Sequence, residues 1–556
     1  MQTSVNQSKS NSKFIFIVGG VMSGIGKGIT TSSIGRVLKD YGFSVTAIKI
    51  DPYFNVDAGT LNPVVHGEVF VTDDGAEADQ DLGNYERFLE QGMSKKNIMT
   101  SGLIYQTVIQ RERNLEYGGD DVEMMRDIPE EVRRRITDVA ETSQAEFVIV
   151  EIGGTAGDNE NLVFLEAARG MKLKDPANVI FVLVSYLPIL ANTGEMKSKP
   201  TQHAMKAINS VGINVDLLIA RASAPVDKPR KKQISRVCGM DEEDIISAPD
   251  VGSIYEVPLN FERDHIGRRI LEKFDLKVKK HDSSEWQKLV DSIHKAKEPV
   301  KIGIVGKYFT SGDFSLTDSY LSVIEAVKHA AWAHGRKPEI TWLNSEEYED
   351  VKSSTTSQEK IKELSEFDGI IVPGGWGSRG IEGKIATAQY CREHNIPYLG
   401  LCYGLQMAVI EYARNVVGLK GAHTTEVDPK TKYPVIDTIP DQIKNITQKI
   451  MGGTARLGAY DCDLAKGSMA ARLYGRTTIS ERHRHRYEVN NEYKAQIEKA
   501  GLIISGTNPQ SNLAEIIELP GHKFFMGSQF HPELKSRPLH PHPLFLGFIK
   551  AAVEKL

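Results

Sequence analysis

The sequence predicts an α/β protein with two packed domains joined by a helical linker. Residues 14–18 form an apolar run that breaks into a glycine-rich loop and continues as a helix-like segment, and residues 396–404 repeat this order around a cysteine. Between the two motifs, residues 284–297 are amphipathic and rich in lysine, and a strand pattern restarts at 301–305. A length of 556 residues is more than one core usually holds, which agrees with two domains.

Composition excludes several classes of protein and partner. With 68 Lys and Arg against 73 Asp and Glu, the formal charge is −5, and 40% of the residues are hydrophobic, as in ordinary globular proteins. So small a charge holds neither nucleic acid nor an anionic membrane nonspecifically. The longest apolar stretch, 179–190, is too short to span a bilayer. We therefore expect no nucleic-acid partner and no membrane segment.

Cysteine usage and the N-terminus favour a cytoplasmic location. The four cysteines, at 238, 391, 402 and 462, lack the spacing typical of disulfide-rich or zinc-binding proteins. Residues 1–13 are polar and lack the apolar core of a secretory signal, so we expect a disordered tail there and a first strand beginning at Phe14.

The first motif is typical of a phosphate-binding loop. The glycine-rich residues 19–28, which include Lys27, lie between a strand and a helix expected over 29–39. In that setting, backbone N–H groups and the helix N-terminus face an anion and the lysine reaches its oxygens, which favours a nucleoside triphosphate. A tight glycine turn with a solvated lysine is the alternative.

A magnesium ion at this loop needs unusual ligands. Gly28 stands where such loops normally carry a serine or threonine, so carboxylates must hold the ion together with the phosphates. Glu151 follows the strand-like run 146–150, and parallel strands deliver ligands at their carboxyl ends. Asp81 is the second candidate, although its acidic, glycine-containing stretch also suits a solvated loop.

Further strand patterns at 179–184 and 215–220 predict a doubly wound α/β layer. Lys197 and Lys199 lie between them in a loop that opens a helix. The pair suits a second polyphosphate, although lysine pairs are more often solvated surface.

The second domain has the pattern of a nucleophilic cysteine. Strand-like residues 396–399 lead into Gly400-Leu-Cys402-Tyr-Gly404, and a helix-like segment follows. Small residues beside the cysteine permit a strained turn that exposes the thiol, and the helix N-terminus behind it favours the thiolate. A buried structural cysteine is the alternative.

Groups that suit this thiol occur elsewhere in the domain. On an extended segment, His531 and Glu533 share one side, so the acid can orient the imidazole that takes the thiol proton. Strand-like residues 370–372 precede Pro-Gly-Gly375, whose N–H groups suit an oxyanion hole. Together these features predict acyl transfer from an amide. The alternating run 482–486 suits an anion better than a metal, because its arginines repel cations.

Long strings across residues 14–556 resemble the CTP synthase family. They are SGIGKG at 23–28, IDPYFNVDAGT at 50–60, HGEVFVTDDGAEAD at 66–79, LGNYERF at 82–88, KSKPTQH at 197–203 and RHRHRYEVNN at 482–491. The resemblance implies a P-loop, dethiobiotin-synthetase-like amidoligase domain over 14–282, a linker helix over 283–299, and a flavodoxin-like class I glutamine amidotransferase domain over 300–556.

The resemblance also implies an activity, co-substrates and partners. In the family, ATP phosphorylates O4 of UTP, and ammonia from glutamine hydrolysis displaces that phosphate to give CTP. The family uses Mg²⁺, is activated allosterically by GTP, and forms homotetramers and sometimes filaments.

Carried over by motif, the resemblance assigns roles to individual residues. The catalytic residues would be Cys402, His531 and Glu533 for glutamine hydrolysis and Lys27 and Lys49 for phosphoryl transfer, with Asp81 and Glu151 as metal ligands. ATP would contact Gly24, Ile25, Gly26, Lys27, Gly28, Ile29, Asp81, Arg221 and Val251. UTP or CTP would contact Ser23, Asp158, Asn159, Glu160, Lys197, Ser198, Lys199, Pro200, Thr201, Gln202 and Gln233. Glutamine would contact Gly375, Tyr403, Gly404, Leu405, Gln406, Glu426 and Arg486, and His66 would lie near the ammonia passage.

Departures from the family pattern concentrate in the nucleotide segments. Residues 122–129 read VEMMRDIP where the family has Gln at 123, Pro at 126 and His at 127. GGTVGDIE appears as GGTAGDNE at 153–160, Gln233 replaces a lysine, and Gln80 replaces a leucine.

Three functions therefore stay open. They are a CTP synthase with an altered pocket, a paralogue that aminates a different pyrimidine or related amide-containing acceptor, and a non-catalytic regulatory or filament-forming homologue. The intact Lys27, Asp81, Glu151 and Cys402 argue against the third, since a binding module does not need them together.

Overall fold

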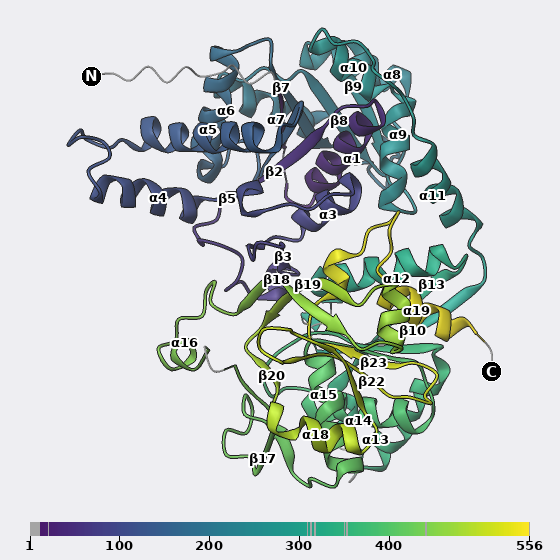
Figure 1. The fold of residues 1–556 in the computed structure, drawn as a ribbon. Helices are drawn as coiled ribbons and strands as arrows, with labels where there is room; N and C mark the ends of the chain where they lie inside the picture. The colour runs from purple at the N-terminus through teal and green to yellow at the C-terminus, as the bar shows by residue number, and fades with distance from the viewer. Residues whose placement is uncertain are drawn as a thin grey trace. The chain divides into compact units, whose positions relative to one another are not determined.

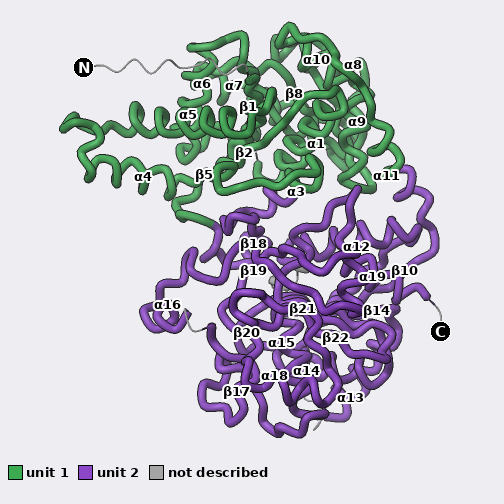
Figure 2. The backbone as a smooth tube through the Cα atoms, in the orientation of Figure 1, with its two compact units in different colours: residues 1–57, 84–290 green, residues 58–83, 291–556 purple. Residues whose placement is uncertain are grey.

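The chain forms two compact units (Figure 2). The computed structural model describes residues 12–20, 22–307, 310–311, 314–315, 318–349, 351, 354–439 and 442–554. Unit 1 comprises Met1–Asp57 and Asn84–Val290, and unit 2 comprises Ala58–Gly83 and Asp291–Leu556. Most of the predicted tail, residues 1–11, lies outside the described residues, and the first strand begins at Lys13, one residue before Phe14.

Unit 1 is a parallel sheet with helices on both faces (Figure 1). Its described strands form a seven-stranded sheet in the order β5-β2-β6-β1-β7-β8-β9, with parallel neighbours throughout. The strands are β1 (Lys13–Gly19), β2 (Val45–Asp51), β5 (Ile98–Thr100), β6 (Phe147–Ile152), β7 (Val179–Tyr186), β8 (Leu217–Ala222) and β9 (Ile245–Pro249). Because β1 lies between β6 and β7, the loop after it opens at the switch point where such sheets bind ligands.

Alternation along β1 sends side chains to both faces of this sheet. Phe14, Phe16 and Val18 join one core cluster, and Ile15 and Ile17 are fully buried on the opposite face. The helices of unit 1 are α1 (Lys27–Asp40), α3 (Asp81–Leu89, shared with unit 2), α4 (Ser101–Arg113), α5 (Met124–Ser143), α6 (Leu162–Lys174), α7 (Lys199–Ser210), α8 (Lys228–Cys238), α9 (Val257–Arg263), α10 (Ile266–Lys273) and α11 (Ser284–Lys295, shared with unit 2).

Unit 2 contains a mixed sheet and three smaller sheets among its described residues: the three-stranded β16-β17-β20 and the hairpins β3-β4 and β11-β12. Its described strands form a nine-stranded sheet in the order β13-β10-β14-β15-β23-β22-β21-β18-β19, parallel from β13 to β23 and antiparallel beyond. These strands are β10 (Pro299–Gly306), β13 (Lys337–Asn344), β14 (Gly369–Val372), β15 (Tyr398–Leu401), β18 (Arg456–Leu464), β19 (Thr478–His485), β21 (Ile503–Thr507), β22 (Ala514–Glu518) and β23 (Phe525–Ser528). Shorter strands are β3 (Phe70–Val71), β4 (Glu77–Ala78), β11 (Thr310–Ser311), β12 (Phe314–Ser315), β16 (Ala422–Thr424), β17 (Tyr433–Thr438) and β20 (Tyr487–Val489).

Both faces of the unit 2 sheet are covered. Ile370 and Val372 of β14 pack with residues of α14 and α15, and Ile371 between them packs with residues of α12 and α19. The helices are α2 (Pro63–His66), α12 (Leu321–Ala333), α13 (Thr355–Lys360), α14 (Ile381–Glu393), α15 (Tyr403–Tyr412), α16 (Ile443–Thr447), α17 (Met469–Tyr474), α18 (Asn491–Lys499) and α19 (Pro543–Val553). Within the described ranges, none of the helices combines the length and apolar character needed to cross a membrane.

The strands and helices predicted around both motifs are confirmed, with ends shifted by a few residues. The predicted strand 146–150 is β6, which extends to Ile152, so Glu151 lies inside the strand and not after it. The predicted linker helix 283–299 contains α11, and all four cysteines are free thiols.

Candidate active sites

Cys402 occupies a strained turn between β15 and α15. Its φ of +49° and ψ of −96° place a non-glycine residue where side chains are rarely found. Glycines on both sides permit the turn: a Cβ on Gly400 would lie 2.7 Å from the Gly404 carbonyl carbon, and one on Gly404 would lie 2.0 Å from the Val372 oxygen. The Cys402 N–H donates to the Ser528 carbonyl at 2.6 Å, which anchors the turn to the neighbouring strand β23.

His531 and Glu533 form the pair predicted for this thiol. Nδ1 of His531 lies 2.7 Å from Oε1 of Glu533. The expectation of an extended segment is wrong, because Glu533 lies in a short 3₁₀ helix, Pro532–Lys535, whose turn brings the carboxylate back to the imidazole. A Cβ on Gly374 would lie 3.0 Å from His531 Cε1 and 3.9 Å from Cys402 Cβ, so both groups meet over this glycine.

The electrostatics of His531 favour proton acceptance. Burial by itself lowers the pKa of His531, but the charges of Glu533 and Cys402 outweigh burial and raise that pKa well above its ordinary value. Among the described residues, no hydrogen-bond partner meets the buried Nε2 of His531. Nδ1 is therefore held by Glu533, and Nε2 is left to exchange a proton with the thiol and its substrate.

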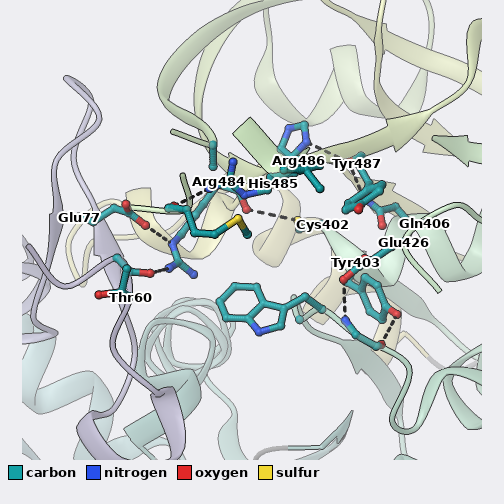
Figure 3. Close-up of a pocket in the computed structure, with 17 residues that line it drawn as sticks. Thr60, Glu77, Cys402, Tyr403, Gln406, Glu426, Arg484, His485, Arg486 and Tyr487 are labelled. Atoms are coloured by element: carbon teal, nitrogen blue, oxygen red, sulfur yellow. Dashed lines mark hydrogen bonds and ion pairs between the residues drawn. The ribbon is translucent and has the colours of Figure 1, made fainter. Parts of the chain in front are cut away.

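A cavity of about 470 Å³ opens beside Cys402 (Figure 3). Residues far apart in the sequence line it, including three from the segment 58–83. The lining residues are Gly59, Thr60, Glu77, Gly375, Trp376, Gly377, Cys402, Tyr403, Gln406, Glu426, Ile446, Met451, Ala455, Arg484, His485, Arg486 and Tyr487. Among the predicted glutamine-binding residues, Gly404 and Leu405 do not line it; Leu405 is fully buried in the core instead.

Polar groups of three kinds face this cavity. Gln406 donates to the Tyr487 carbonyl at 2.7 Å, and its buried Oε1 has no partner among the described residues. Glu426 accepts a hydrogen bond from the Gly377 N–H at 2.6 Å. Arg486 donates to Thr454 Oγ1 at 3.0 Å. An amide acceptor, a carboxylate and a guanidinium around one thiol suit a small zwitterionic amide.

Residues 482–485 form the end of strand β19, and their side chains alternate between its two faces. Arg482 pairs with Asp73 and Arg484 with Glu77, each at 2.7 Å, so the anions that these arginines bind are carboxylates of the chain itself. Between them, His483 and His485 point inward and hydrogen-bond each other at 2.9 Å. Burial, then the charge of Arg456, lowers the pKa of both histidines well below the ordinary value, so both are neutral.

A smaller cavity of about 80 Å³ also touches the triad. Its lining includes Cys402, His531, Pro63, Glu68 and Tyr320. His66 is an exposed residue of the short helix α2 that begins at Pro63, and it does not itself line this cavity.

In unit 1, the phosphate-binding loop has the predicted form. Gly24 and Gly26 adopt φ values of +72° and +89°, which favour glycine, and α1 begins at Lys27. Lys27 Nζ donates to the Gly154 carbonyl at 2.8 Å. Arg221 lies against the same loop, since a Cβ on Gly26 would be 3.8 Å from its Nε.

Glu151 is buried among polar groups at the end of β6. Its Oε1 lies 2.9 Å from Lys49 Nζ, and the two residues are register partners on β6 and β2. Its Oε2 accepts from Thr31 Oγ1 at 3.2 Å and from the Tyr85 hydroxyl. The described residues contain no cluster of three or more candidate metal ligands. A carboxylate at the end of a strand still fits Mg²⁺, which takes one or two carboxylates plus phosphate oxygens.

Several predicted nucleotide residues are bound to neighbours. Lys197 pairs with Glu195 at 2.6 Å, and Thr201 Oγ1 is buried against Ser185 Oγ at 2.9 Å. Asp158 accepts from the Thr155 N–H at 2.8 Å.

The substituted segment 122–129 forms its own ionic network at the start of α5. Arg126 pairs with Glu123 at 3.4 Å and with Asp127 at 3.0 Å, and all of these contacts are at the surface. Asp127 also accepts from the N–H of Glu123, the residue just before α5, at 2.7 Å.

Comparison with known protein families also divides the chain into two parts. Residues 13–276 match the family described as CTP synthase N-terminus, and residues 315–551 match glutamine amidotransferase class-I. Fold and site therefore define a two-domain enzyme class in which a class I glutaminase is joined to a P-loop synthase domain.

Relatives of nearly equal length identify the family within that class. A CTP synthase from Synechococcus sp. (strain JA-3-3Ab) is 48% identical over 98% of this chain and 97% of its own, and one from Pyrococcus abyssi is 49% identical over 98% of each. The structure titled Trypanosoma brucei CTPS, glutaminase domain with bound acivicin, is 39% identical over 46% of this chain and 95% of that chain, with a TM-score of 0.42. The chain belongs to the CTP synthase family. Nothing in these comparisons favours a different acceptor or a non-catalytic role.

Sequence reasoning missed several groups around Cys402. Thr60, Glu77 and Trp376 line the large cavity, although none of them was assigned to the glutamine site. Thr60 and Glu77 lie inside the strings 50–60 and 66–79 that carry the family resemblance, and Trp376 follows the Pro-Gly-Gly375 turn. Lys384 is a fully buried lysine near the site. The sequence does mark this lysine, because it stands three residues after Ile381 and one before Ile385, on the apolar stripe of a helix.

Proposed function

We propose that this chain is a glutamine-hydrolysing CTP synthase, which transfers ammonia from glutamine to UTP at the expense of ATP. The observation that carries the proposal is the Cys402–His531–Glu533 arrangement beside a 470 Å³ cavity, in a chain that also contains the phosphate-binding loop. The two parts have separate chemistry: one releases ammonia and the other activates the acceptor that captures it.

In the glutaminase, the cavity takes glutamine with its side-chain amide at Cys402. The thiol proton passes to Nε2 of His531, and the sulfur attacks the amide carbonyl to form a tetrahedral oxyanion. His531 then protonates the leaving nitrogen, the C–N bond breaks, and ammonia departs from a thioester. Water, deprotonated by His531, hydrolyses the thioester to glutamate and restores the thiol. Gln406, Glu426 and Arg486 would hold the amino-acid end of the substrate.

In the synthase, Lys27 and Lys49 would contact the phosphates of ATP while the γ-phosphoryl group moves to O4 of UTP. Ammonia then adds at C4, and phosphate leaves with the O4 oxygen to give CTP. Asp81 and Glu151 would hold Mg²⁺, which neutralises phosphate charge during the transfer. ATP would contact the loop from Gly24 to Ile29 together with Arg221 and Val251.

The remaining assignments belong to the same proposal. UTP or CTP would bind Ser23, residues 158–160, residues 197–202 and Gln233, and ammonia would pass near His66. GTP would act as an allosteric activator, and the protein would work in the cytoplasm as a homotetramer, with filaments as a higher assembly. The proposed domain limits are 14–282 and 300–556.

Mass spectrometry of the purified protein with ATP, Mg²⁺, glutamine and a panel of pyrimidine nucleotides tests the proposal. The expected result is CTP formed from UTP, with one ADP, one phosphate and one glutamate for each CTP. Amination of another pyrimidine in preference to UTP would instead identify a paralogue, and absence of any aminated product would contradict an enzymatic role.

A further inference from the structure

A buried lysine holds the first carbonyl of the glycine turn beside Cys402. The turn, residues 373–377, follows strand β14. Lys384 has no exposed surface, and its Nζ donates to the Pro373 carbonyl at 3.3 Å. This lysine stands on the stripe of α14 that is otherwise formed by Ile381, Ile385 and Ala388. Burying an ammonium in such a stripe costs stability, so an apolar residue would pack there more favourably.

A second lysine holds the other end of the same turn. Lys307, the residue after β10, is 4% exposed and donates to the carbonyls of Trp376 and Gly377, the latter at 3.3 Å. The ammonium groups of Lys384 and Lys307 lie 5.3 Å and 5.4 Å from the ring centre of Tyr403, the residue after the nucleophile. Lys384, Lys307 and Tyr403 therefore form one cluster, and Tyr403 is the residue that follows Cys402.

Two tyrosines complete the set of donors. The Tyr320 hydroxyl donates to the Gly374 carbonyl at 3.4 Å, and the Tyr403 hydroxyl donates to the Gly377 carbonyl at 2.8 Å. Side-chain donors thus hold the carbonyls of Pro373, Gly374, Trp376 and Gly377, and of the turn's five carbonyls only that of Gly375 has no such donor among the described contacts.

Because the peptide group is planar, a contact that fixes a carbonyl also fixes the direction of the N–H that follows it. In a trans peptide, the carbonyl of one residue and the N–H of the next point in opposite directions. Because the carbonyls of Pro373 and Gly374 point toward Lys384 and Tyr320, the N–H groups of Gly374 and Gly375 point away from those side chains. Gly374 and Gly375 both line the smaller cavity that includes Cys402 and His531, and Gly375 lines the larger one as well. No described residue accepts a hydrogen bond from either N–H.

We propose that Lys384 is a positioning residue of the glutaminase: by holding the Pro373 carbonyl, it aims the Gly374 N–H at the oxyanion formed when Cys402 attacks glutamine, and Tyr320 does the same for the Gly375 N–H. Lys307 fixes the other end of the turn, where the Gly377 N–H donates to Glu426. The proposal rests on the glutaminase activity inferred above. Neither lysine touches the reacting atoms. Both act through the turn, and their contribution appears when the oxyanion forms and not when glutamine binds.

The charges of the cluster support this role. Burial, followed by the neighbouring charge of Lys307, lowers the pKa of Lys384 to about 7, while Cys402 acts in the opposite direction. Burial lowers the pKa of Lys307 to about 8, and the carboxylate of Glu426 opposes that shift. A negative charge on Cys402 therefore interacts favourably with the ammonium of Lys384, and the carboxylate of Glu426 interacts favourably with that of Lys307.

The substitution Lys384→Met tests the proposal, because methionine has a similar length and no donor. Lys494→Met is the matched control: Lys494 also donates to a backbone carbonyl, that of Asn512 at 2.7 Å, but on helix α18 away from the turn. In the full chain, we expect Lys384→Met to lower kcat for glutamine hydrolysis about tenfold or more, with a much smaller change in KM. Ammonia-dependent CTP formation should match that of the control, and the thermal unfolding midpoint should equal or exceed it, because the variant no longer buries an ammonium group.

Further variants keep the test decisive if Lys384→Met does not fold. Lys307→Met and Tyr320→Phe each remove one other donor to the turn and should also lower kcat more than they raise KM. A folded Lys384→Met protein with unchanged kcat, or a loss confined to KM, overturns the proposal. So does an equal loss of ammonia-dependent synthesis, which would indicate a general packing role. Failure of the unmodified protein to hydrolyse glutamine would instead refute the proposed function.

Discussion

The two units differ in the state of the side chains predicted to carry out their reactions. In unit 2, Cys402 is held in a strained turn and His531 is bound to Glu533, so the groups proposed to make and break bonds are already in place. In unit 1, the cations of the predicted nucleotide site are bound to groups of the chain: Lys27 to the Gly154 carbonyl and Lys49 to Glu151.

This difference follows from what each reaction requires. Covalent attack by a thiol needs a nucleophile and a base at a set distance, and a strained backbone maintains that distance. Phosphate binding needs positive charge more than exact position, and lysines can exchange a carbonyl or carboxylate partner for a phosphate oxygen. We therefore expect substitutions in unit 2 to abolish one reaction cleanly, and substitutions of paired charges in unit 1 to affect stability as well as rate.

The largest expected effect is that of Cys402→Ala. Without the sulfur nucleophile, glutamine-dependent CTP formation should fall by about four powers of ten or more, whereas synthesis from ammonium chloride should stay near the wild-type rate. Cys391→Ala is the control, since this thiol is buried in the same unit away from the cavity. Loss of both activities in a folded Cys402→Ala protein would contradict the independence of the two units.

Glu151→Gln and Asp81→Asn should have the next largest effect. Removing a carboxylate that holds Mg²⁺ should lower amination by about two powers of ten or more, with basal glutamine hydrolysis retained. Glu151→Gln also removes the nearer of two carboxylates beside the buried Lys49, the other being Asp51 at 3.5 Å, so its thermal unfolding midpoint should fall. Glu146→Gln, at a half-buried position just before the same strand, is the control. Near-normal amination in either variant would point to another ligand.

A pH effect on stability should follow from Glu488 in unit 2. Burial, opposed by Arg456 and reinforced by Glu515, raises the pKa of Glu488 to about 8. A raised pKa means that the folded state keeps a proton that the unfolded chain loses near its ordinary pKa of 4.5, so stability falls as pH rises toward 8. Between about pH 6 and pH 8, the free energy of unfolding should fall by about 2 kcal/mol through this group.

Urea unfolding of Glu488→Gln checks this expectation. Glutamine cannot ionise, so the variant should lose less stability than the wild type over the same pH range. Glu492→Gln, on the exposed surface of the neighbouring helix α18, should retain the wild-type slope. Equal slopes in all three proteins would show that Glu488 does not hold the proton.

The smallest expected effect concerns the substituted nucleotide segments of unit 1. Glu123 and Gln233 are both exposed, and Arg126 neutralises part of the added negative charge. The double substitution Glu123→Gln with Gln233→Lys should therefore tighten UTP by only about 1 kcal/mol, less at high salt. Titration with UTP and with CTP measures this change. Micromolar UTP affinity and strong CTP inhibition in the unmodified protein would contradict the hypothesis that its nucleotide pocket is altered.

Local sequence predicted the elements around both motifs because their signals are local. An apolar strand, a glycine-rich or Gly-x-Cys-x-Gly turn and a following helix are set by backbone sterics and short-range periodicity, and β1–α1 and β15–α15 have that form. The pairing of His531 with Glu533 was also predicted, but for a wrong reason, because the 3₁₀ turn that brings them together has no clear local signature.

By itself, then, the sequence determined the two-domain α/β class and the family, and it predicted the pair of the proposed nucleophile Cys402 and base His531. Only the tertiary structure decided that segment 58–83 packs with unit 2 and lines the cavity with Thr60 and Glu77, and that Lys384 and Lys307 hold the glycine turn. The physical reason is that burial and hydrogen-bond partners depend on packing between residues that are from 11 to more than 400 positions apart in the chain. A buried lysine in an apolar stripe is visible in the sequence, but the carbonyl that it binds becomes known only when the sheet and helices are assembled.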